Sequence, residues 1–267
     1  MVEGFVEPAR PLDPLLIEPE FRRVAVLSDV HGNLPALEAC LAEIAGERVD
    51  SIFFLGDLTW GPQPLEVLAR VADLDVPTWF VKGNAERAVE ELAAGSRPAE
   101  GINSAWTALA HGPDGVATVS AFAPALDLRM AGLGTIRLCH GSPRSDIELL
   151  TPATPIERLE RALAGVPNSV VGHGHTHLQY QRIVAERTVF GPGSVGIPYG
   201  TEGRPGARWA LLEDTIELRV SDYDIEDAIA IARAVGYPGI VGYEESLRTP
   251  PTLAEIVDDA EGREFAD

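Results

Sequence analysis

The chain alternates short, wholly apolar runs with longer stretches in which apolar residues recur every three or four positions. A continuous apolar run is typical of a strand buried on both faces of a sheet, and the wider spacing is typical of a helix with one buried face. In the first part of the chain the runs predict strands at 24–28, 51–55 and 78–81. A predicted helix follows each of these strands, at 34–44, 64–74 and 85–94.

The second part of the chain is richer in strands that turn back on one another. The runs 126–130 and 135–139 flank the sequence AGLG and predict a hairpin. Further strands are predicted at 168–172, 180–185, 187–191, 207–212 and 215–220, and further helices at 156–163 and 224–235. Residues 95–124 predict helical turns interrupted by prolines. Parallel-type strands first and antiparallel strands later predict an α/β fold, a four-layer α/β/β/α sandwich of two mixed sheets flanked by helices.

The regular pattern begins near residue 22 and fades near residue 242. We therefore expect one domain over 22–242, preceded by an N-terminal arm (1–21) and followed by an acidic C-terminal tail (243–267). The arm and the tail are expected to add little to the core, because both are rich in proline or charge. A short amphipathic helix within 252–260, docked on the body, is the alternative for the tail.

Composition limits the location and the partners. No run approaches the roughly 20 apolar residues that cross a membrane, and the proline-containing first 21 residues lack the basic region of a signal peptide. The two cysteines, Cys40 and Cys139, lie among apolar residues and are too few for a disulfide framework. We therefore expect a cytoplasmic protein. The net charge of −20 argues against broad binding of nucleic-acid phosphates, and solubility is its simpler role.

Polar residues that can bind metal ions follow five of the predicted strands. In chain order they are Asp29 and His31, Asp57, Asn84, His140, and His175 with His177. Ligands of open α/β sheets bind beyond the carboxyl ends of the strands, so we expect these side chains to meet at one edge. Within each two-residue pair the members are two positions apart, so in an extended chain both side chains would leave on the same side.

The residue types favour a particular class of metal. Carboxylate, imidazole and amide groups form a mixed oxygen and nitrogen set that suits divalent Mn, Fe, Zn, Ni or Co. No cysteine cluster is present, which excludes a thiolate zinc site. Each motif alone is weak, because a Gly-Asp or Gly-Asn pair is usually a turn and a single histidine such as His140 is usually structural. The ordered set contains five of the six histidines, and it is this set that favours a metal centre.

The order D-x-H, G-D, G-N, H and G-H-x-H over residues 29–177 resembles that of the calcineurin-like metallophosphoesterase family. The surrounding motifs SDVHGN, GDLTWGP, CHGSP, GHTH and GPGSVG are similar to those of its small bacterial and archaeal phosphatases, a branch similar to diadenosine tetraphosphate hydrolases. The resemblance implies a phosphomonoesterase, phosphodiesterase or dinucleoside polyphosphate hydrolase. Its substrate would be a small phosphorylated molecule. We expect no membrane partner, and the sequence predicts no oligomeric state.

The resemblance also implies a role for each candidate ligand on two divalent metal ions. Asp29, His31 and His177 would bind one ion, and Asn84, His140 and His175 would bind the other. Asp57 would bridge both, and a hydroxide between the ions would attack phosphorus in line with the leaving group. Asp57, Asn84 and His140 would in this way be catalytic as well as metal-binding.

The third motif departs from the family pattern. Many members carry a histidine after Gly-Asn that donates a proton to the leaving oxygen, whereas this chain has Ala85, followed by Glu86. Glu86 stands where a carboxylate would hold that histidine, and the proton donor is left open. His173 is an extra histidine that could donate the proton, and a structural role within its strand is the favoured alternative.

Three residues near the motifs are candidates for binding substrate: Asn33, Arg144 and His173. Each has a structural alternative, because Asn33 can hold the turn after His31, Arg144 can be an ordinary surface residue, and His173 can be bonded within its strand. Trp60 could stack on a nucleobase or pack locally, and packing is favoured. His111, in an irregular stretch, is expected on the surface.

Two classes of function remain. The first is a metal-dependent phosphoesterase. The second is a non-catalytic metal-binding scaffold of the same fold, because the family includes a retromer subunit that serves as a protein-binding module. The presence of every expected ligand favours the enzyme.

Overall fold

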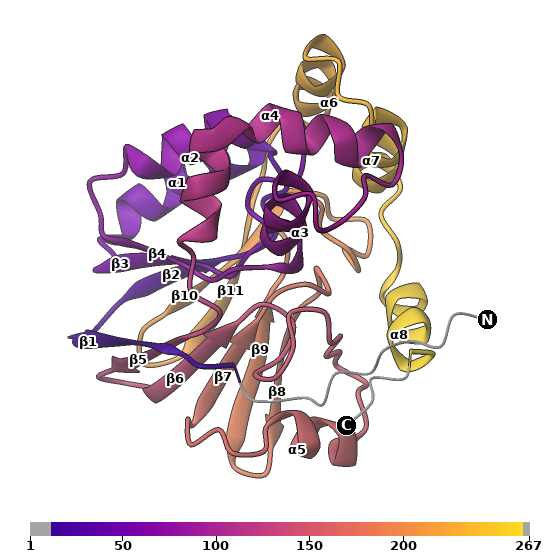
Figure 1. The fold of residues 1–267 in the computed structure, drawn as a ribbon. Coiled ribbons are helices and arrows are strands. Elements are labelled where there is room, and N and C mark those ends of the chain that lie inside the picture. The colour runs from indigo at the N-terminus through magenta and orange to yellow at the C-terminus, as the bar shows by residue number, and fades with distance from the viewer. Residues whose placement is uncertain (1–11, 264–267) are drawn as a thin grey trace.

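The apolar runs of the chain form two β-sheets that lie face to face between layers of helices (Figure 1). The computed structural model describes residues 12–263. The six-stranded sheet has the order β1 (Leu15–Phe21), β5 (Leu126–Met130), β6 (Gly134–Cys139), β7 (Val170–His173), β9 (Arg187–Pro192) and β8 (Gln179–Val184). The five-stranded sheet has the order β11 (Ile216–Ser221), β10 (Ala207–Leu212), β2 (Val24–Leu27), β3 (Ser51–Phe54) and β4 (Thr78–Phe80).

Helices cover the outer faces of both sheets, so the predicted α/β/β/α sandwich is confirmed (Figure 1). The helices are α1 (Leu34–Glu47), α2 (Pro64–Ala72), α3 (Asn84–Ala93), α4 (Gly101–Ser120), α5 (Ile156–Ala162), α6 (Ile225–Ala234), α7 (Ile240–Arg248) and α8 (Leu253–Glu261). Helices α1, α2 and α4 lie over the five-stranded sheet, and α5 lies over the six-stranded sheet. Helix α4 is interrupted at Gly112, where φ is 55°, just before Pro113.

Strand β2 shows why a continuous apolar run was the right signal for these strands. Val24 and Val26 point into the core between the two sheets, whereas Ala25 and Leu27 point into the core beneath α1 and α2. Successive side chains of a strand leave on opposite faces, and here both faces are buried. Strands β2, β3 and β4 are parallel, as are β6, β7 and β9, so the loops after their carboxyl ends gather at common edges.

The N-terminal arm was expected to contribute little to the core, and for residues 15–21 this was wrong. They form β1, which pairs in parallel with β5 and buries Ile17 and Phe21 between the sheets. The strand is at the sheet edge, and its pairing register shifts between Leu16 and Glu20, a stretch that contains Pro19. Proline is tolerated at edges and irregularities of this kind, which is why its presence concealed the strand.

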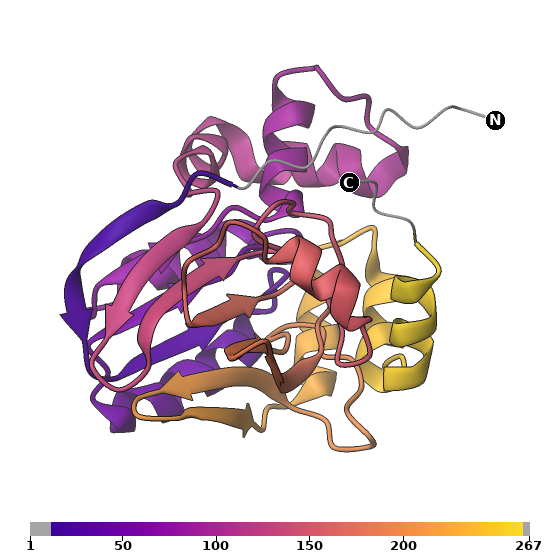
Figure 2. The same ribbon diagram turned by 90° about the horizontal axis from the view of Figure 1, so that it is seen from below.

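The expected C-terminal tail forms two packed helices, so the docked-helix alternative holds and the loose tail does not. Tyr243 and Leu247 of α7 pack against α6, and Ala260 of α8 is fully buried. Glu261 of α8 forms an ion pair with Arg158 of α5 at 3.3 Å. Figure 2 shows α8, the last helix before the C-terminus, beside α5. Residues 1–11 of the expected arm and 264–267 of the expected tail lie outside the described residues.

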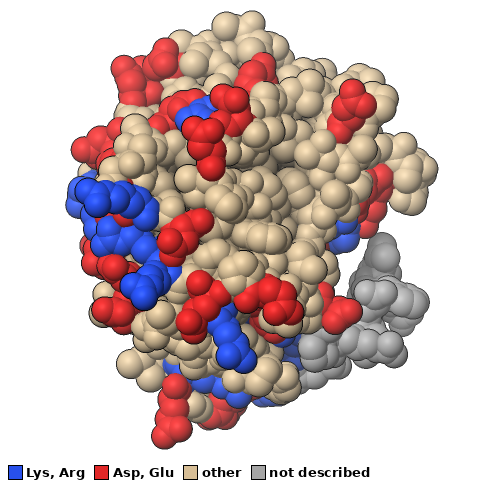
Figure 3. Space-filling model, turned by 90° about the vertical axis from the view of Figure 1, so that its left-hand side faces the viewer, with Lys and Arg blue, Asp and Glu red and all other residues tan. Residues whose placement is uncertain are grey.

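The expectations from composition concern the cysteines, the surface charge and membrane-spanning helices. Cys40 and Cys139 are free and buried. On the face shown in Figure 3, basic side chains lie among acidic ones. Ion pairs join such groups in the structure: Arg23 pairs with both Glu47 and Glu213. Within residues 12–263, no helix combines the length and the apolar character needed to cross a membrane. A cytoplasmic location stays a prediction.

Candidate metal centre

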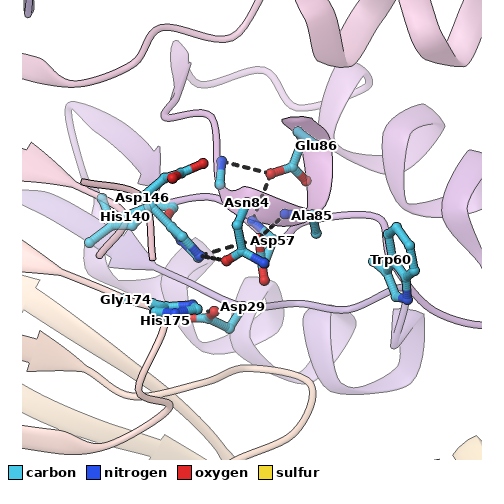
Figure 4. Close-up of polar contacts among 12 residues, drawn as sticks. Asp29, Asp57, Trp60, Asn84, Ala85, Glu86, His140, Asp146, Gly174 and His175 are labelled. Carbon is cyan, nitrogen blue, oxygen red and sulfur yellow. Dashed lines mark hydrogen bonds and ion pairs between the residues drawn. The ribbon is translucent and has the colours of Figure 1, made fainter. Parts of the chain in front are cut away.

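The loops after β2, β3, β4, β6 and β7 bring all seven candidate ligands together. Six of them form two groups in which the ligand atoms lie within 4.8 Å of one another: Asp29, His31 and His177, and Asp57, His140 and His175. The seventh, Asn84, is the first residue of α3, and its Oδ1 lies 2.9 Å from His140 Nε2. In Figure 4 the side chains of Asp57, Asn84 and His140 point toward one another.

Asp57 belongs to the second group and also faces the first. Its Oδ1 is 3.2 Å from His140 Nε2 in one group, and its Oδ2 is 3.7 Å from His31 Nε2 in the other. Because its two oxygens face different groups, this carboxylate is placed where a bridging ligand would be.

The backbone conformation of these residues differs from the extended chain that their two-residue spacing suggested. Positive φ angles of 49° to 65° occur at five of the seven candidates: Asp29, His31, Asp57, His175 and His177. A left-handed conformation costs a non-glycine residue about 1–2 kcal/mol. The side chains converge because the chain turns sharply at each of these residues, and strain of this kind clusters at functional sites.

Hydrogen bonds between neighbouring loops hold the strained turns. The N–H of Asp29 donates to Gly56 O at 3.0 Å, and the N–H of His31 donates to Asp57 O at 2.9 Å. Gly83 allows a close approach, because a Cβ at this position would lie 2.3 Å from Asp57 Oδ1. At Gly83 the glycine beside a candidate ligand thus has the role that the sequence predicted.

Backbone carbonyls determine which ring nitrogen of three histidines is free. Nδ1–H donates to Trp60 O in His31 (3.1 Å), to Leu55 O in His140 (2.6 Å) and to Ile197 O in His177 (2.6 Å). In this tautomer, which we assign from the carbonyl partners, Nε2 carries a lone pair. Carbonyl bonds of this kind are the usual support of metal-binding histidines.

The free nitrogens face one another. His31 Nε2 and His177 Nε2 are only 3.1 Å apart, and Asp29 Oδ1 is 3.3 Å from His177 Nε2. In the neutral rings, two lone pairs and a carboxylate oxygen at these distances repel one another unless a proton or a metal ion lies between them. The residues present therefore fit a divalent cation.

The buried carboxylates are held in their charged form. Burial raises the pKa of Asp29, but a protonated His177, which donates to it through Nε2 when no metal ion is bound, outweighs burial and holds that pKa at about 2. Burial is likewise outweighed at Asp57, where His140 keeps the pKa well below its usual range. Burial lowers the pKa of both rings, but Asp57 raises that of His140 to about 10 and Asp29 raises that of His177 above its ordinary value. Burial and then His140 lower the pKa of His175 to about 4. The metal-free site thus holds protons on two imidazoles, and binding of a metal ion would displace them.

Glu86 has a role that sequence reasoning missed. Its carboxylate is fully buried and accepts from the N–H groups of Asp57 (2.8 Å), Leu58 (2.8 Å) and Gly83 (2.9 Å). It therefore ties the loop that carries Asp57 to the start of α3. Burial and then Asp57 raise its pKa to about 7. The available signal was its position three residues after the helix N-cap, which is that of a capping box.

Two of the three candidates for binding substrate have polar atoms that are already bonded within the protein. Asn33 is buried, caps α1 and donates to Gly196 O at 2.9 Å, so it holds the turn. His173 is buried, with ring nitrogens 2.6 Å from Tyr180 Oη and 3.0 Å from Gly174 O, and burial lowers its pKa to about 4. Both side chains have the structural role that was the alternative, because their polar atoms are already occupied.

The remaining residues near the site are also accounted for. Arg144 is paired with Glu148 through Nε (2.9 Å) and Nη2 (2.8 Å). Trp60 is partly buried and packs against the core beneath α1 and α2. His111 was expected on the surface, which was wrong: it is buried, and its Nε2 lies 2.8 Å from Thr59 Oγ1.

Comparison with known proteins gives a family match over most of the chain. A model of the calcineurin-like phosphoesterase superfamily domain matches residues 23–213. The phosphodiesterase YfcE of Escherichia coli is 28% identical in an alignment of 214 residues, which covers 76% of this chain and 95% of that protein. An uncharacterized protein of Methanocaldococcus jannaschii is 42% identical over 53 residues, 20% of this chain and 22% of that protein.

Solved structures match over a similar extent. A metallophosphoesterase from Sphaerobacter thermophilus is 26% identical with a TM-score of 0.67, covering 85% of this chain and all of the other. A hypothetical protein from Pyrococcus horikoshii is 19% identical with a TM-score of 0.75, covering 86% and 99%. The second likeness concerns the fold alone.

Proposed function

The chain belongs to the calcineurin-like phosphoesterase superfamily, and from this premise we propose that it is a dinuclear metal-dependent phosphoesterase. Its substrates are small phosphorylated molecules carrying a phosphate ester or anhydride: phosphomonoesters, phosphodiesters or dinucleoside polyphosphates. The name of the YfcE relative favours a phosphodiesterase within this class.

One observation supports the proposal most directly. The Nε2 atoms of His31 and His177 lie 3.1 Å apart while both Nδ1–H groups are held by backbone carbonyls. With both rings neutral in this tautomer the pair places two acceptors together, so either a proton or a metal ion lies between them, and the carboxylate of Asp29 beside the pair completes a metal-binding group. A cation between them removes the repulsion.

The proposed ligand sets follow the two groups of side chains. Asp29, His31 and His177 hold the first ion, and Asn84, His140 and His175 hold the second. Asp57 contributes one oxygen to each set. When bound, two such ions supply Lewis-acid polarisation of a phosphoryl group and a water of lowered pKa.

The residues around the ligands limit which leaving groups can depart. Ala85 has no acidic proton to give, and its N–H donates to Asp57 Oδ1 at 2.9 Å. His173 is buried with both ring nitrogens engaged, so it is not placed to donate either. We therefore propose that the enzyme prefers aryl esters and anhydrides, whose leaving oxygens depart without a proton.

The test combines metal analysis with hydrolysis of nitrophenyl phosphate mono- and diesters and of a dinucleoside polyphosphate. The wild-type protein and the exposed-surface control Asp75→Asn should carry close to two divalent cations per chain and hydrolyse at least one substrate. Asp57→Asn should lose ions from both sites and most activity. Full metal content and full activity in Asp57→Asn would contradict the bridging role. Metal binding without hydrolysis of any ester would favour the scaffold alternative.

A further inference from the structure

The loop that joins β9 to β10 wraps the first ligand group. The N–H of Gly196 donates to Asp29 O at 3.0 Å, and Ile197 O accepts the Nδ1–H of His177 at 2.6 Å. The loop thereby holds the backbone of one candidate ligand and the ring of another.

Tyr199 of the same loop adds a second restraint on His177. Its ring stacks on the imidazole, with centroids 4.6 Å apart and planes inclined by 23°. Its N–H donates to His177 O at 3.4 Å. The bond from Nδ1 to Ile197 O limits rotation of the imidazole within its plane, and the stacked ring limits tilting out of that plane. Both movements would change where Nε2 points.

Tyr199 also connects this restraint to the C-terminal helices. Burial raises the pKa of its phenol and Ser246 of α7 lowers it, which places that serine beside the phenol. The adjacent Gly200 N–H donates at 2.9 Å to the carbonyl of Pro251, in the connection between α7 and α8. Helix α7 is itself anchored, because Tyr243 and Leu247 are buried against α6. Helix α7, which lies far beyond His177 in the sequence, is therefore connected to the first metal site through the ring of Tyr199.

We propose that Tyr199 is a positioning residue for the first metal site, and that α7 acts on this site through the contact of Ser246 with Tyr199. The inference rests on the proposed binding of a metal ion by His177. Groups that orient a ligand ring typically contribute 10–100-fold to metal affinity. The effect is confined to one site, because the ring neighbour of His175 is His140, at 5.0 Å, and not a tyrosine.

The test measures the affinity of each site separately. Apo-protein is titrated with Co²⁺ by calorimetry and visible absorption, in a His175→Ala background to report the first site and in a His31→Ala background to report the second. Tyr199→Leu should weaken the first site about 10–100-fold and shift its absorption bands, while the second site is unchanged. Tyr199→Phe keeps the stacked ring and should recover most of this loss.

Ser246→Ala tests the link to α7. It should cause the same small loss at the first site as Tyr199→Phe, and the double variant should lose no more than either single one, because both changes remove the same hydroxyl contact. Tyr243→Phe is the matched control. It removes a tyrosine hydroxyl of α7 that is buried without a hydrogen-bond partner among the described residues, so both affinities should stay unchanged.

The outcomes separate the inference from the proposed function. Absence of divalent-cation binding in the wild-type protein would overturn both. Unchanged affinity at the first site in Tyr199→Leu would overturn the positioning role alone. An equal loss at both sites, accompanied by a lower melting temperature, would show that Tyr199 only stabilises the fold. If Tyr199→Leu fails to fold, unequal effects of Tyr199→Phe and Ser246→Ala would still contradict the link to α7.

Discussion

Replacing Glu86 tests whether one buried carboxylate holds the Asp57 loop against α3. The carboxylate accepts three backbone N–H groups at 2.8–2.9 Å and has no exposed surface. A buried donor left without a partner costs about 1–3 kcal/mol. Glu86→Ala would orphan three donors and cost about 3–9 kcal/mol, which is comparable to the whole stability of a typical domain, about 5–15 kcal/mol. Glutamine is therefore the informative replacement.

Glu86→Gln keeps the shape and one acceptor oxygen. That oxygen can serve Asp57 and Gly83, which share Oε2, and the amide NH₂ then faces the N–H of Leu58. One hydrogen bond is lost, at about 1–3 kcal/mol. At about 2–4 °C per kcal/mol for a chain of this size, the melting temperature should fall by about 2–12 °C.

Thermal unfolding and metal content are measured together for this variant. Because the loop carries Asp57, Glu86→Gln should also bind less metal than the wild-type protein. Glu91→Gln, on the same helix, is the control: its carboxylate pairs at the surface with Arg87 and Arg97, and surface pairs contribute about 0–1 kcal/mol. A melting temperature and metal content of Glu86→Gln equal to those of Glu91→Gln would refute the reasoning.

Three further predictions concern the edge strand, a buried histidine and the missing acid. Ile17→Ala should lower the free energy of unfolding, measured in urea, by about 2–5 kcal/mol, because Ile17 is only 3% exposed. The control Leu16→Ala, at a 60% exposed position of the same strand, should cost less than about 0.5 kcal/mol. Equal costs would show that β1 is not part of the core. Burial lowers the pKa of His111 below its ordinary 6.5, so the unfolded chain takes up the proton first and stability falls as the pH drops below 6.5. His111→Gln should flatten that fall between pH 7.5 and 5.5, and an unchanged pH dependence would contradict it. Ala85→His should flatten the dependence of the hydrolysis rate on leaving-group pKa across a series of aryl phosphates, because a general acid contributes about 10²–10⁴-fold with poor leaving groups. Equal slopes in the two proteins would show that the added imidazole does not reach the leaving oxygen or that another group already donates the proton.

The carboxylate beside Ala85 changes what that last experiment can achieve. Glu86 was expected to be available to hold a histidine at this position. Its oxygens are instead occupied by three backbone N–H groups. An imidazole introduced at position 85 would thus lack the carboxylate partner that the sequence led us to expect, and only the folded structure reveals this.

The linear pattern was sufficient for the features that depend on each residue's own burial and on chain order. Continuous apolar runs such as 24–28 identified strands buried on both faces, because both sides of β2 pack against apolar residues. The seven candidate ligands were identified because each follows a strand, and parallel strands bring their carboxyl ends to a common edge. Periodicity and order are local properties, so they can be read without knowing the partners.

Features that depend on residues far apart in the chain were decided by the tertiary structure. The left-handed turns at Asp29 and Asp57 persist because neighbouring loops hold them, and nothing in a short stretch of sequence specifies that support. The ring of His173 is occupied by Tyr180 of the next strand, which rules it out as a substrate ligand. Strand β1 was not predicted because an edge strand has only one partner and tolerates proline. The direction in which a histidine ring points is set by carbonyls and rings from other elements, and so the pairing of His177 with Tyr199 exists only in the folded chain.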